Sequence, residues 1–390
     1  MEYLHSVFDK LLRETSSTFH RYLYDEIDWG SRMIGIMGPR GVGKTTMLLQ
    51  YIKEHLSRKD TLYVVAEDLY FSSHTLIELA DQFTKIGGRH LFIDEIHKYK
   101  DWSRELKLIY DYHAELQVVF TGSSVLDISS GVSDLSRRVL AYTMQGLSYR
   151  EYLQLRHKIS LPKYSIKQIL QQEVTIPDGF LPLEHFSDYL HRGYYPYLHD
   201  DHYATYVQAG INATLEIDIP QYYDLSVSMM RKLKRLLGII AQSAPFKPNM
   251  TQIGGQIGMS RNNISDLCEL MQRAGLIGLL RDSTNGIMSL GKLEKVYLDN
   301  TTLIYAIGNP MVEIGTVRET FFFNQLRTVS NITASPVSDF LVDKTYTFEV
   351  GGKHKKQKQI QGIDNAFVVK DDSETGYGNI IPLWQFGLLY

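Results

Sequence analysis

The stretch Gly38-Pro39-Arg40-Gly41-Val42-Gly43-Lys44-Thr45 decides the fold of the N-terminal part of the chain. It fits the phosphate-binding pattern G-x-x-x-x-G-K-S/T, with an apolar run at 33–37 before it and a helical pattern at 44–56 after it. In such a loop, backbone N–H groups turn inward around phosphates, and the helix N-terminus adds partial positive charge. We therefore expect a buried strand, a phosphate-binding loop and a helix.

This loop predicts ATP and Mg²⁺ as ligands. Lys44 would reach the β- and γ-phosphates, and the hydroxyl of Thr45 would ligate Mg²⁺. The alternative is a Gly-rich turn that matches the pattern by chance. The predicted nucleotide contacts are Gly38, Pro39, Arg40, Gly41, Val42, Gly43, Lys44, Thr45 and Thr46.

A second motif supports the first. The apolar run 91–93 ends in Asp94 and Glu95. Asp94 would hold the Mg²⁺ through water, and Glu95 would orient and deprotonate the attacking water. The simpler alternative is that both acids cap the next helix. Thr121 and Ser123 close a further apolar run, and either hydroxyl is a candidate sensor of the γ-phosphate, with turn chemistry as the alternative.

Apolar runs and helical patterns alternate through the first 145 residues. Short apolar strands between helices predict an α/β fold, in which a parallel sheet has helices on both faces. An amphipathic helix is also expected over residues 1–26. The expected strands lie at 33–37, 61–66, 91–93, 117–120 and 139–144, with helices such as 76–83 and 102–113 between them.

In the remainder of the chain, the pattern of apolar residues changes twice, near residues 146 and 226. Residues 146–225 read as mainly helical. After them, three helical patterns and two apolar runs flanking Thr284-Asn285-Gly286, a strong hairpin signal, predict a winged helix. Residues from about 310 onward read as a small α/β module with a helix at 318–326 and another near 357–363.

The chain resembles the prokaryotic AAA+-like ATPases in which a P-loop domain precedes a winged helix and a nuclease-like C-terminal domain. The resemblance implies a sheet ordered 5-1-4-3-2. It also implies an ATPase core at 1–145, a helical lid at 146–225, a winged helix at 226–298 and a nuclease-like α/β domain at 299–390. The motifs that carry it are GPRGVGKTT (38–46), LFIDEIHKYKDW (91–102), VVFTGSS (118–124), DLSRRVLAYTMQGLSYREYL (134–153), GYYPY (193–197) and DFLVDKTYTFEVGGK (339–353).

The same resemblance implies further site residues. Arg138, or its neighbour Arg137, would reach the nucleotide of an adjacent subunit in a homo-oligomer, with a solvated surface pair as the alternative. Pro196, in a lid motif whose second glycine is replaced by tyrosine, would approach the adenine.

A PD-(D/E)xK-type nuclease site is also implied. It would contain Glu319, Asp339 and Glu349 around Mg²⁺. The motif's lysine is replaced by Gly351, so Lys353 is the nearest candidate. We expect a degenerate, structural nuclease fold in preference to an active one.

Charge narrows the choice of partners. The 390 residues carry 41 Lys or Arg and 44 Asp or Glu, a net charge of −3, which excludes a histone-like protein. Residues 226–297 nevertheless hold ten basic and four acidic residues, a net charge of +6, and Arg231, Lys232, Lys234 and Arg235 cluster in this segment. DNA is therefore a candidate partner of the winged helix, and the run at 353–358 is a second basic patch.

The single cysteine, Cys268, and the absence of a leader or of an apolar run long enough for a membrane favour a cytoplasmic protein without a membrane partner. The resulting hypothesis is a Mg²⁺-dependent ATPase whose nucleotide state repositions the lid and the winged helix, with DNA as a candidate partner. The alternatives are a non-hydrolysing nucleotide switch that acts as a protein-interaction module and an ATP-regulated nuclease.

Overall fold

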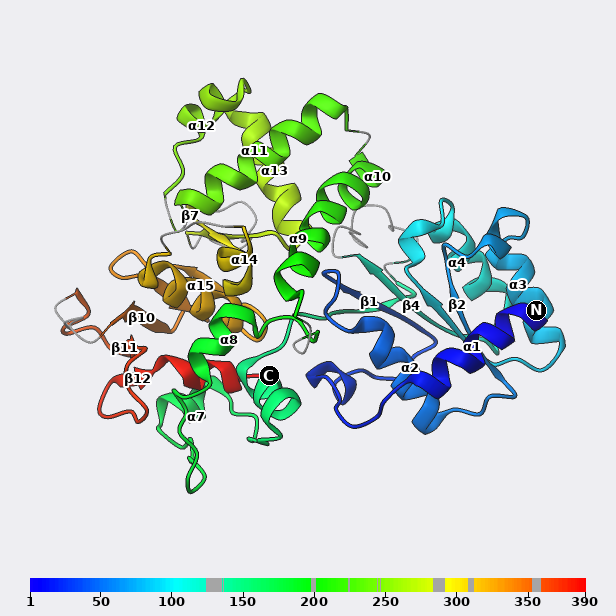
Figure 1. The fold of residues 1–390 in the computed structure, drawn as a ribbon, viewed down its shortest axis with the longest axis horizontal. Helices are drawn as coiled ribbons and strands as arrows, with labels where there is room; N and C mark the ends of the chain where they lie inside the picture. Colours follow the sequence, from blue (N-terminus) through cyan, green and yellow to red (C-terminus); the bar gives the residue numbers. More distant parts are fainter. Residues whose placement is uncertain are drawn as a thin grey trace. The chain divides into compact units, whose positions relative to one another are not determined.

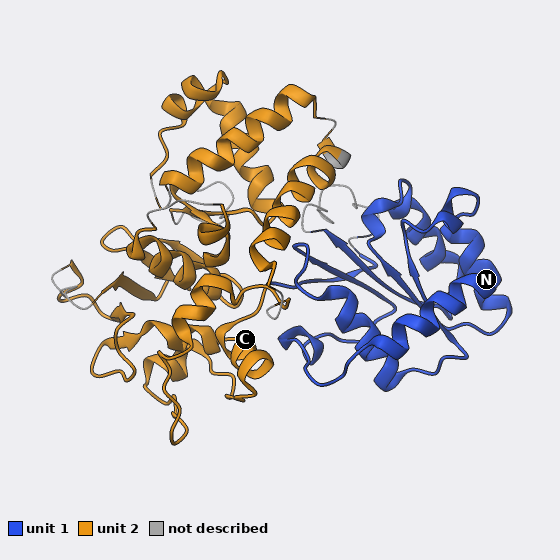
Figure 2. Cartoon of the chain, in the orientation of Figure 1, with its two compact units in different colours: residues 1–145 blue, residues 146–390 orange. Residues whose placement is uncertain are grey.

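The structure is a computed structural model in which the chain forms two compact units, unit 1 over residues 1–145 and unit 2 over residues 146–390 (Figure 2). The division of unit 2 into lid, winged helix and nuclease-like domain stays a prediction. The described residues are 1–123, 135, 137–197, 201–223, 225–243, 245, 247–282, 292–307, 312–352 and 359–390.

Unit 1 is built on a five-stranded parallel sheet in the order β2-β3-β4-β1-β5 (Figure 1). This is the expected 5-1-4-3-2 order counted from the other edge, so the α/β prediction is confirmed. The apolar runs of the inner strands are buried on both faces, and every residue of β1 is buried, whereas the edge strand β5 is mostly exposed. The strands are β1 (Met33–Gly38), β2 (Thr61–Val65), β3 (His90–Asp94), β4 (Gln117–Ser123) and β5 (Leu140–Thr143).

Helices and short 3-10 turns connect these strands. The predicted helix over 1–26 was too long, because α1 ends at Glu14, where four hydroxyl residues (15–18) compete for backbone hydrogen bonds. The α-helices are α1 (Glu2–Glu14), α2 (Lys44–His55), α3 (Leu76–Lys85) and α4 (Trp102–Tyr112); the 3-10 helices are η1 (Tyr22–Tyr24), η2 (Leu69–Ser72) and η3 (Ile96–Lys98).

Unit 2 begins with a helical region. Its α-helices are α6 (Tyr149–Tyr152), α7 (Ile166–Leu170), α8 (Phe186–Arg192), α9 (Tyr203–Ala213) and α10 (Ile219–Tyr223), and π-helical turns cover Leu153–His157 and Thr214–Asp218. Within the described parts of the chain, no helix is both long enough and apolar enough to cross a membrane.

Three helices and a two-stranded antiparallel sheet follow, and we call residues 226–298 the winged-helix segment. Its helices are α11 (Val227–Ser243), α12 (Met250–Ile257) and α13 (Arg261–Arg273), and its strands are β6 (Ile277–Arg281) and β7 (Leu293–Leu298). The side chain of Ser260 accepts a hydrogen bond from the Asn263 N–H and thereby caps the N-terminus of α13. The predicted Asn285-Gly286 turn lies outside the described residues.

The C-terminal part of unit 2 is a mixed five-stranded sheet in the order β12-β11-β10-β9-β8. Of the helix predicted near 357–363, Gln359 is in a 3-10 conformation, but residues 360–362 form a turn, and Gly362 at φ 79° and Asn365 at φ 55° are left-handed. The elements of this C-terminal part are α14 (Thr301–Ala306), α15 (Ile314–Leu326), β8 (Ile332–Ala334), β9 (Phe340–Val342), β10 (Tyr346–Gly351), β11 (Ala366–Lys370), β12 (Ile380–Pro382) and η8 (Leu383–Leu388).

The helical region and the C-terminal part share one aromatic core. Phe321 on α15 lies edge-on to Phe186 on α8, with ring centroids 5.0 Å apart. The last residue of the chain is also tied to the first turn of the helical region, because Ser148 Oγ donates to the Tyr390 carbonyl at 2.7 Å. Burial of these large rings explains why residues far apart in sequence form a single unit.

Two adjacent glycines of α12 give a stability test of the winged-helix segment. A Cβ at Gly254 would lie 2.5 Å from the Met259 carbonyl oxygen, whereas a Cβ at Gly255 meets no atom within 4 Å. We expect Gly254→Ala to destabilise unit 2 by about 2 kcal/mol, because rigid backbone blocks the new methyl group. Gly255→Ala should stabilise it by about 0.8 kcal/mol through helix propensity. Denaturant unfolding of both variants measures the difference, and equal effects would contradict this packing.

Candidate nucleotide-binding site

The loop between β1 and α2 has the backbone conformation that phosphate binding requires. Gly41 at φ 77° and Gly43 at φ 98° both lie in the left-handed region, which disfavours residues with a Cβ. Gly43 is also the N-cap of α2, so the loop ends at a helix N-terminus. A Cβ on Gly38 would lie 2.3 Å from the Met144 carbonyl oxygen, so the start of the loop also admits only glycine.

Lys44 lies in this loop with its side chain almost fully buried. Its Nζ donates to the carbonyl oxygens of Gly38 at 2.8 Å and Pro39 at 2.9 Å. These bonds hold an ammonium group against the loop through neutral carbonyl dipoles. A positive charge held in this way, beside a helix N-terminus, fits a phosphate group.

A buried arginine that the sequence analysis did not single out donates hydrogen bonds to the backbone of the loop. Arg21, only 4% exposed, donates to the Val42 carbonyl within the loop and to the Gln145 carbonyl at 2.7 Å. It precedes the loop by almost twenty residues and belongs to no motif, so no local signal marked it. Its guanidinium joins the loop to the last residue of unit 1.

Asp94, at the end of β3, is the centre of the site. Its Oδ2 accepts from the Thr45 hydroxyl at 2.6 Å and from the Tyr63 hydroxyl at 2.7 Å, and its Oδ1 accepts from the Thr121 hydroxyl. Three separately predicted residues, Thr45, Asp94 and Thr121, are therefore brought together. The sheet order causes this, since β3 lies between β2, which carries Tyr63, and β4, which carries Thr121.

Tyr63 was missed because it lies inside an apolar run with no motif around it. Burial, together with the negative charges of Asp94 and Glu95, raises the pKa of its phenol well above the usual value. The group therefore stays a hydrogen-bond donor at neutral pH. Thr45 also donates its proton to Asp94, which leaves its oxygen lone pairs available to a metal ion.

Glu95 follows Asp94 in a left-handed conformation, φ 53°, which is uncommon for a residue other than glycine. Its N–H donates to Thr121 Oγ1 at 3.0 Å. Its side chain makes no capping hydrogen bond to η3, so the capping alternative does not describe it. Instead, Glu95 Oε2 lies 3.2 Å from Nε2 of His97, and the N–H of Ser123 donates to His97 Nδ1 at 3.3 Å.

His97 is thus a second site residue that the sequence analysis missed. Its side chain is fully buried, and it connects the end of β4 to the carboxylate of Glu95. The two candidate sensors differ accordingly: the Thr121 hydroxyl contacts Asp94, whereas the Ser123 backbone contacts His97.

The resemblance also implies Arg138 and Pro196 as site residues. Arg138 forms a bidentate ion pair with Asp111, with Nε–Oδ1 at 2.9 Å and Nη2–Oδ2 at 3.2 Å, and Arg137 is exposed. Pro196 lies in unit 2, between Tyr195 and Tyr197, whose rings stack 5.5 Å apart. Its approach to an adenine stays a prediction.

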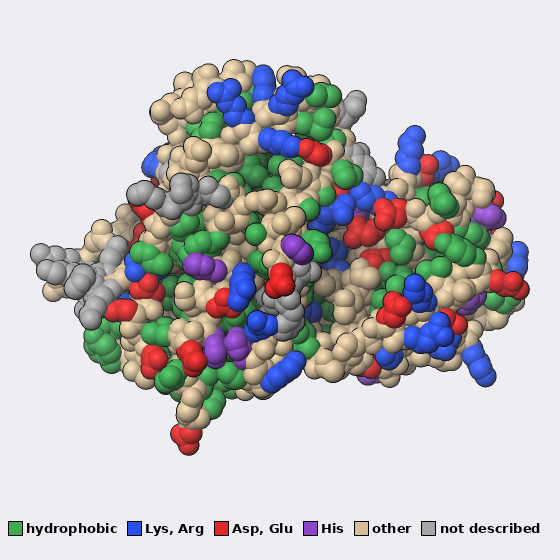
Figure 3. All heavy atoms as spheres, in the orientation of Figure 1, with side chains coloured by type: hydrophobic (Ala, Val, Ile, Leu, Met, Phe, Trp, Pro, Cys, Tyr) green, Lys and Arg blue, Asp and Glu red, His purple; other side chains and the backbone are tan. Residues whose placement is uncertain are grey.

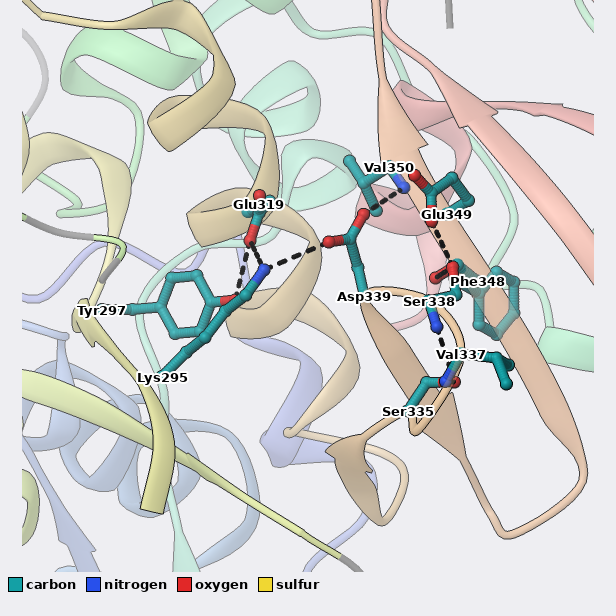
Figure 4. A network of polar contacts seen from close by, with 10 residues as sticks. All are labelled: Lys295, Tyr297, Glu319, Ser335, Val337, Ser338, Asp339, Phe348, Glu349 and Val350. Atoms are coloured by element: carbon teal, nitrogen blue, oxygen red, sulfur yellow. Dashed lines mark hydrogen bonds and ion pairs between the residues drawn. The ribbon is translucent and has the colours of Figure 1, made fainter. Parts of the chain in front are cut away.

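The nuclease-like residues form a separate cluster in unit 2. Glu319, Asp339 and Glu349 lie near one another, with Lys295 reaching between Glu319 and Asp339 (Figure 4). Among the described residues, no three acidic, histidine or cysteine side chains are arranged to hold a metal ion. Because Lys295 already bridges two of these carboxylates, the residues as they stand do not fit a Mg²⁺ ion. Lys353 and the basic run at 353–358 lie outside the described residues.

Lys and Arg side chains gather over the winged-helix segment (Figure 3). On α11, Arg231 and Arg235 are exposed, but Lys234 pairs with Glu216, and Lys232 Nζ donates to the Gly258 carbonyl at 2.9 Å. Part of this cluster is thus neutralised or bound within the chain. On α13, the exposed polar residues are Arg261, Asn262, Asn263, Asp266, Gln272 and Arg273.

Comparison with known families assigns the first unit. Residues 30–153 match the family model described as "AAA domain". The chain contains an AAA domain. This domain includes the loop, Asp94, Glu95 and Thr121, so nucleotide binding and an ATPase type of domain follow from the match. Residues 183–311 match a model described as a domain of unknown function, DUF8612.

Three solved structures resemble this chain at low identity and low TM-score. A structure concerned with katanin self-assembly has 20% identity and a TM-score of 0.26, over 41% of this chain and 58% of that one. PCH-2 from C. elegans has 15% identity and a TM-score of 0.27, over 70% and 66%. AMPPCP-bound DnaA from Aquifex aeolicus has 15% identity and a TM-score of 0.28, over 68% and 85%. The chain thus spans less than two thirds of the katanin chain. No curated protein matches it.

The hydroxyl cluster around Asp94 gives a stability test of the AAA domain. Tyr63→Phe removes one hydrogen bond to a buried carboxylate and keeps the ring. We expect unit 1 to lose about 2 kcal/mol of unfolding free energy, the scale of a hydrogen bond to a charged group. Tyr112→Phe, at a residue 71% exposed, is the matched control and should change nothing. Urea unfolding without nucleotide measures both, and an unchanged Tyr63→Phe midpoint would contradict this role.

Proposed function

We propose that the chain is a Mg²⁺-dependent ATPase whose nucleotide state repositions the helical lid and the winged-helix segment. The observation that carries the proposal is the junction of Lys44, Thr45, Asp94 and Thr121 at the ends of three adjacent elements. Such a junction offers a cation for the phosphates, oxygen ligands for a metal ion and a hydroxyl beside both.

When ATP and Mg²⁺ bind, the metal would supply charge neutralisation at the β- and γ-phosphates. Thr45 would ligate it, and Asp94 would hold it through water. Lys44 would exchange its carbonyl partners for phosphate oxygens, a favourable exchange because an anion replaces dipoles around the same ammonium group. Thr121 would report the γ-phosphate to Asp94 and to the Glu95 backbone, both of which it already contacts.

Glu95 is the proposed general base, and His97 is its proposed positioning residue. The Ser123 N–H points at Nδ1, so the proton of a neutral imidazole resides on Nε2, which faces Glu95. An N–H directed at the carboxylate would restrict its rotamers and keep it near the strand ends. His97 would thereby couple the end of β4 to the orientation of the base.

Movement would reach unit 2 through the end of unit 1. Arg21 contacts both the Val42 carbonyl in the loop and the Gln145 carbonyl, the last residue before unit 2. A change in the loop on phosphate binding would therefore be transmitted through Arg21 to Gln145. Such a device needs no contact between nucleotide and unit 2.

A slow or non-hydrolysing switch is the second candidate. It is favoured by the 3.2 Å approach of Glu95 Oε2 to His97 Nε2, because a carboxylate that stays beside His97 would be less available to activate water. Such a chain would bind ATP tightly and act as a protein-interaction module. Pre-steady-state burst measurements against steady-state turnover separate the two candidates. DNA as a partner of the winged-helix segment, and a homo-oligomer in which Arg138 leaves Asp111 for a neighbour's nucleotide, are further parts of the proposal.

Two substitutions test the ATPase itself. Lys44→Ala should abolish measurable ATP binding and hydrolysis, since it removes the ammonium group proposed to contact the β- and γ-phosphates. Glu95→Gln should keep ATP binding and lower kcat by about 10²-fold or more, because it removes the base but preserves the shape. Fluorescent-nucleotide titration and phosphate release measure the two steps. Normal turnover in Glu95→Gln would remove Glu95 as the base.

A pair of conservative substitutions tests His97. Gln keeps an N–H donor near the Nε2 position, whereas Asn keeps only an acceptor near Nδ1. We expect His97→Asn to lower kcat by about tenfold or more with KM for ATP unchanged, and His97→Gln to retain most of the activity. Equal losses in both variants, with equal losses of stability, would indicate a purely structural histidine.

A further inference from the structure

The carboxylate cluster of unit 2 is filled by a cation from another part of the same unit. Lys295, on β7 of the winged-helix segment, places Nζ 2.8 Å from Glu319 Oε2 and 3.1 Å from Asp339 Oδ1 (Figure 4). Glu319 comes from α15, and Asp339 lies directly before β9. One ammonium group thus bridges two carboxylates from two elements of the C-terminal part.

Other donors within the chain also contact the three carboxylates of the cluster. The Tyr297 hydroxyl donates to Glu319 Oε2 at 2.8 Å, and the Val350 N–H donates to Asp339 Oδ2 at 3.0 Å. Glu349, 2% exposed, accepts from the Ser338 hydroxyl. Lys295 and Tyr297 act together because residues two apart on a strand share a face.

Burial opposes the charge of Lys295, but Glu319 and Asp339 outweigh it and raise the pKa of the ammonium group above its usual value. Burial and Glu319 likewise raise the pKa of the Tyr297 phenol, so this group stays protonated. The cluster therefore already has an ammonium group and a phenol hydroxyl within hydrogen-bonding distance of its carboxylates. A divalent ion would have to displace the first of them.

We propose that the ammonium group of Lys295 occupies the cation position of this carboxylate cluster, where a nuclease would bind a divalent metal ion. The cluster then acts as an ion-pair clamp that fixes the winged-helix segment to the C-terminal sheet. It replaces a metal-dependent site, because a cation fixed to β7 satisfies the same carboxylates without an exchangeable ion.

A second buried contact supports the clamp. Asp299, directly after β7, pairs with Arg327, and its carbonyl accepts from Asn324 Nδ2 at 2.8 Å. The Asp299 side chain is only 3% exposed. The end of β7 is therefore bound to α15 independently of Lys295, so the winged-helix segment and the C-terminal sheet are expected to move as one body.

Removal of the ammonium group should create a metal site, which thermal unfolding can detect. Lys295→Met keeps most of the side-chain volume and leaves Glu319 and Asp339 without their shared cation. Without metal, this variant should melt below the unmodified chain. With MnCl₂ at about five times its Kd, its melting temperature should rise by about 2–4 °C, whereas the unmodified chain should not respond.

Three controls complete the experiment, all run without nucleotide so that the AAA domain contributes no metal site. Lys295→Arg keeps a cation and should not respond to Mn²⁺, and Lys292→Ala, just before β7, should behave like the unmodified chain. Lys295→Met combined with Glu319→Gln and Asp339→Asn should lose the Mn²⁺ response. Equal stabilisation of the unmodified chain and Lys295→Met by Mn²⁺, or no response in Lys295→Met by calorimetry as well as by melting, would overturn the proposal.

Discussion

The buried carboxylate of Asp94 is the constraint on which unit 1 depends. A charge at this depth is tolerated only when donors surround it, and here three hydroxyls from the loop helix, β2 and β4 supply them. These donors lie within reach only if β3 is flanked by β2 and β4 and if the loop after β1 returns over the strand ends. The order of the strands is therefore what brings the hydroxyl donors of the site to Asp94.

Two lysines show how the partners of an ammonium group decide its role. Lys44 is held by carbonyl dipoles of Gly38 and Pro39, which an anionic ligand can replace at a gain. Lys295 is held by two carboxylates, which already compensate its charge. The first arrangement allows a phosphate to bind Lys44, and in the second the ammonium group of Lys295 takes the place that a metal ion would occupy. The residue type is identical, and only the surrounding oxygens differ.

Contacts within each unit determine how motion would be transmitted. In unit 2, the aromatic contacts of Phe321, the contact of Ser148 with Tyr390 and the Lys295 clamp join three segments of very different sequence position. A proposed nucleotide-driven movement would then act on unit 2 as a body and not on a loosely tethered winged helix. Arg21 provides the complementary link in unit 1, because it contacts both the phosphate-binding loop and Gln145.

The sequence by itself determined the elements of unit 1 and its principal motif residues. Apolar runs buried on both faces and glycines required at positive φ are local properties, so the strands, the loop and the acids after β3 were predictable. Helix ends were less so: α1 stopped at the hydroxyl run after Glu14, where side chains compete for backbone hydrogen bonds. Only the tertiary structure decided which distant side chains complete each site. Tyr63, His97, Arg21 and Lys295 have no motif of their own, and they act because folding brings a hydroxyl, an imidazole, a guanidinium and an ammonium group against charges far away in sequence.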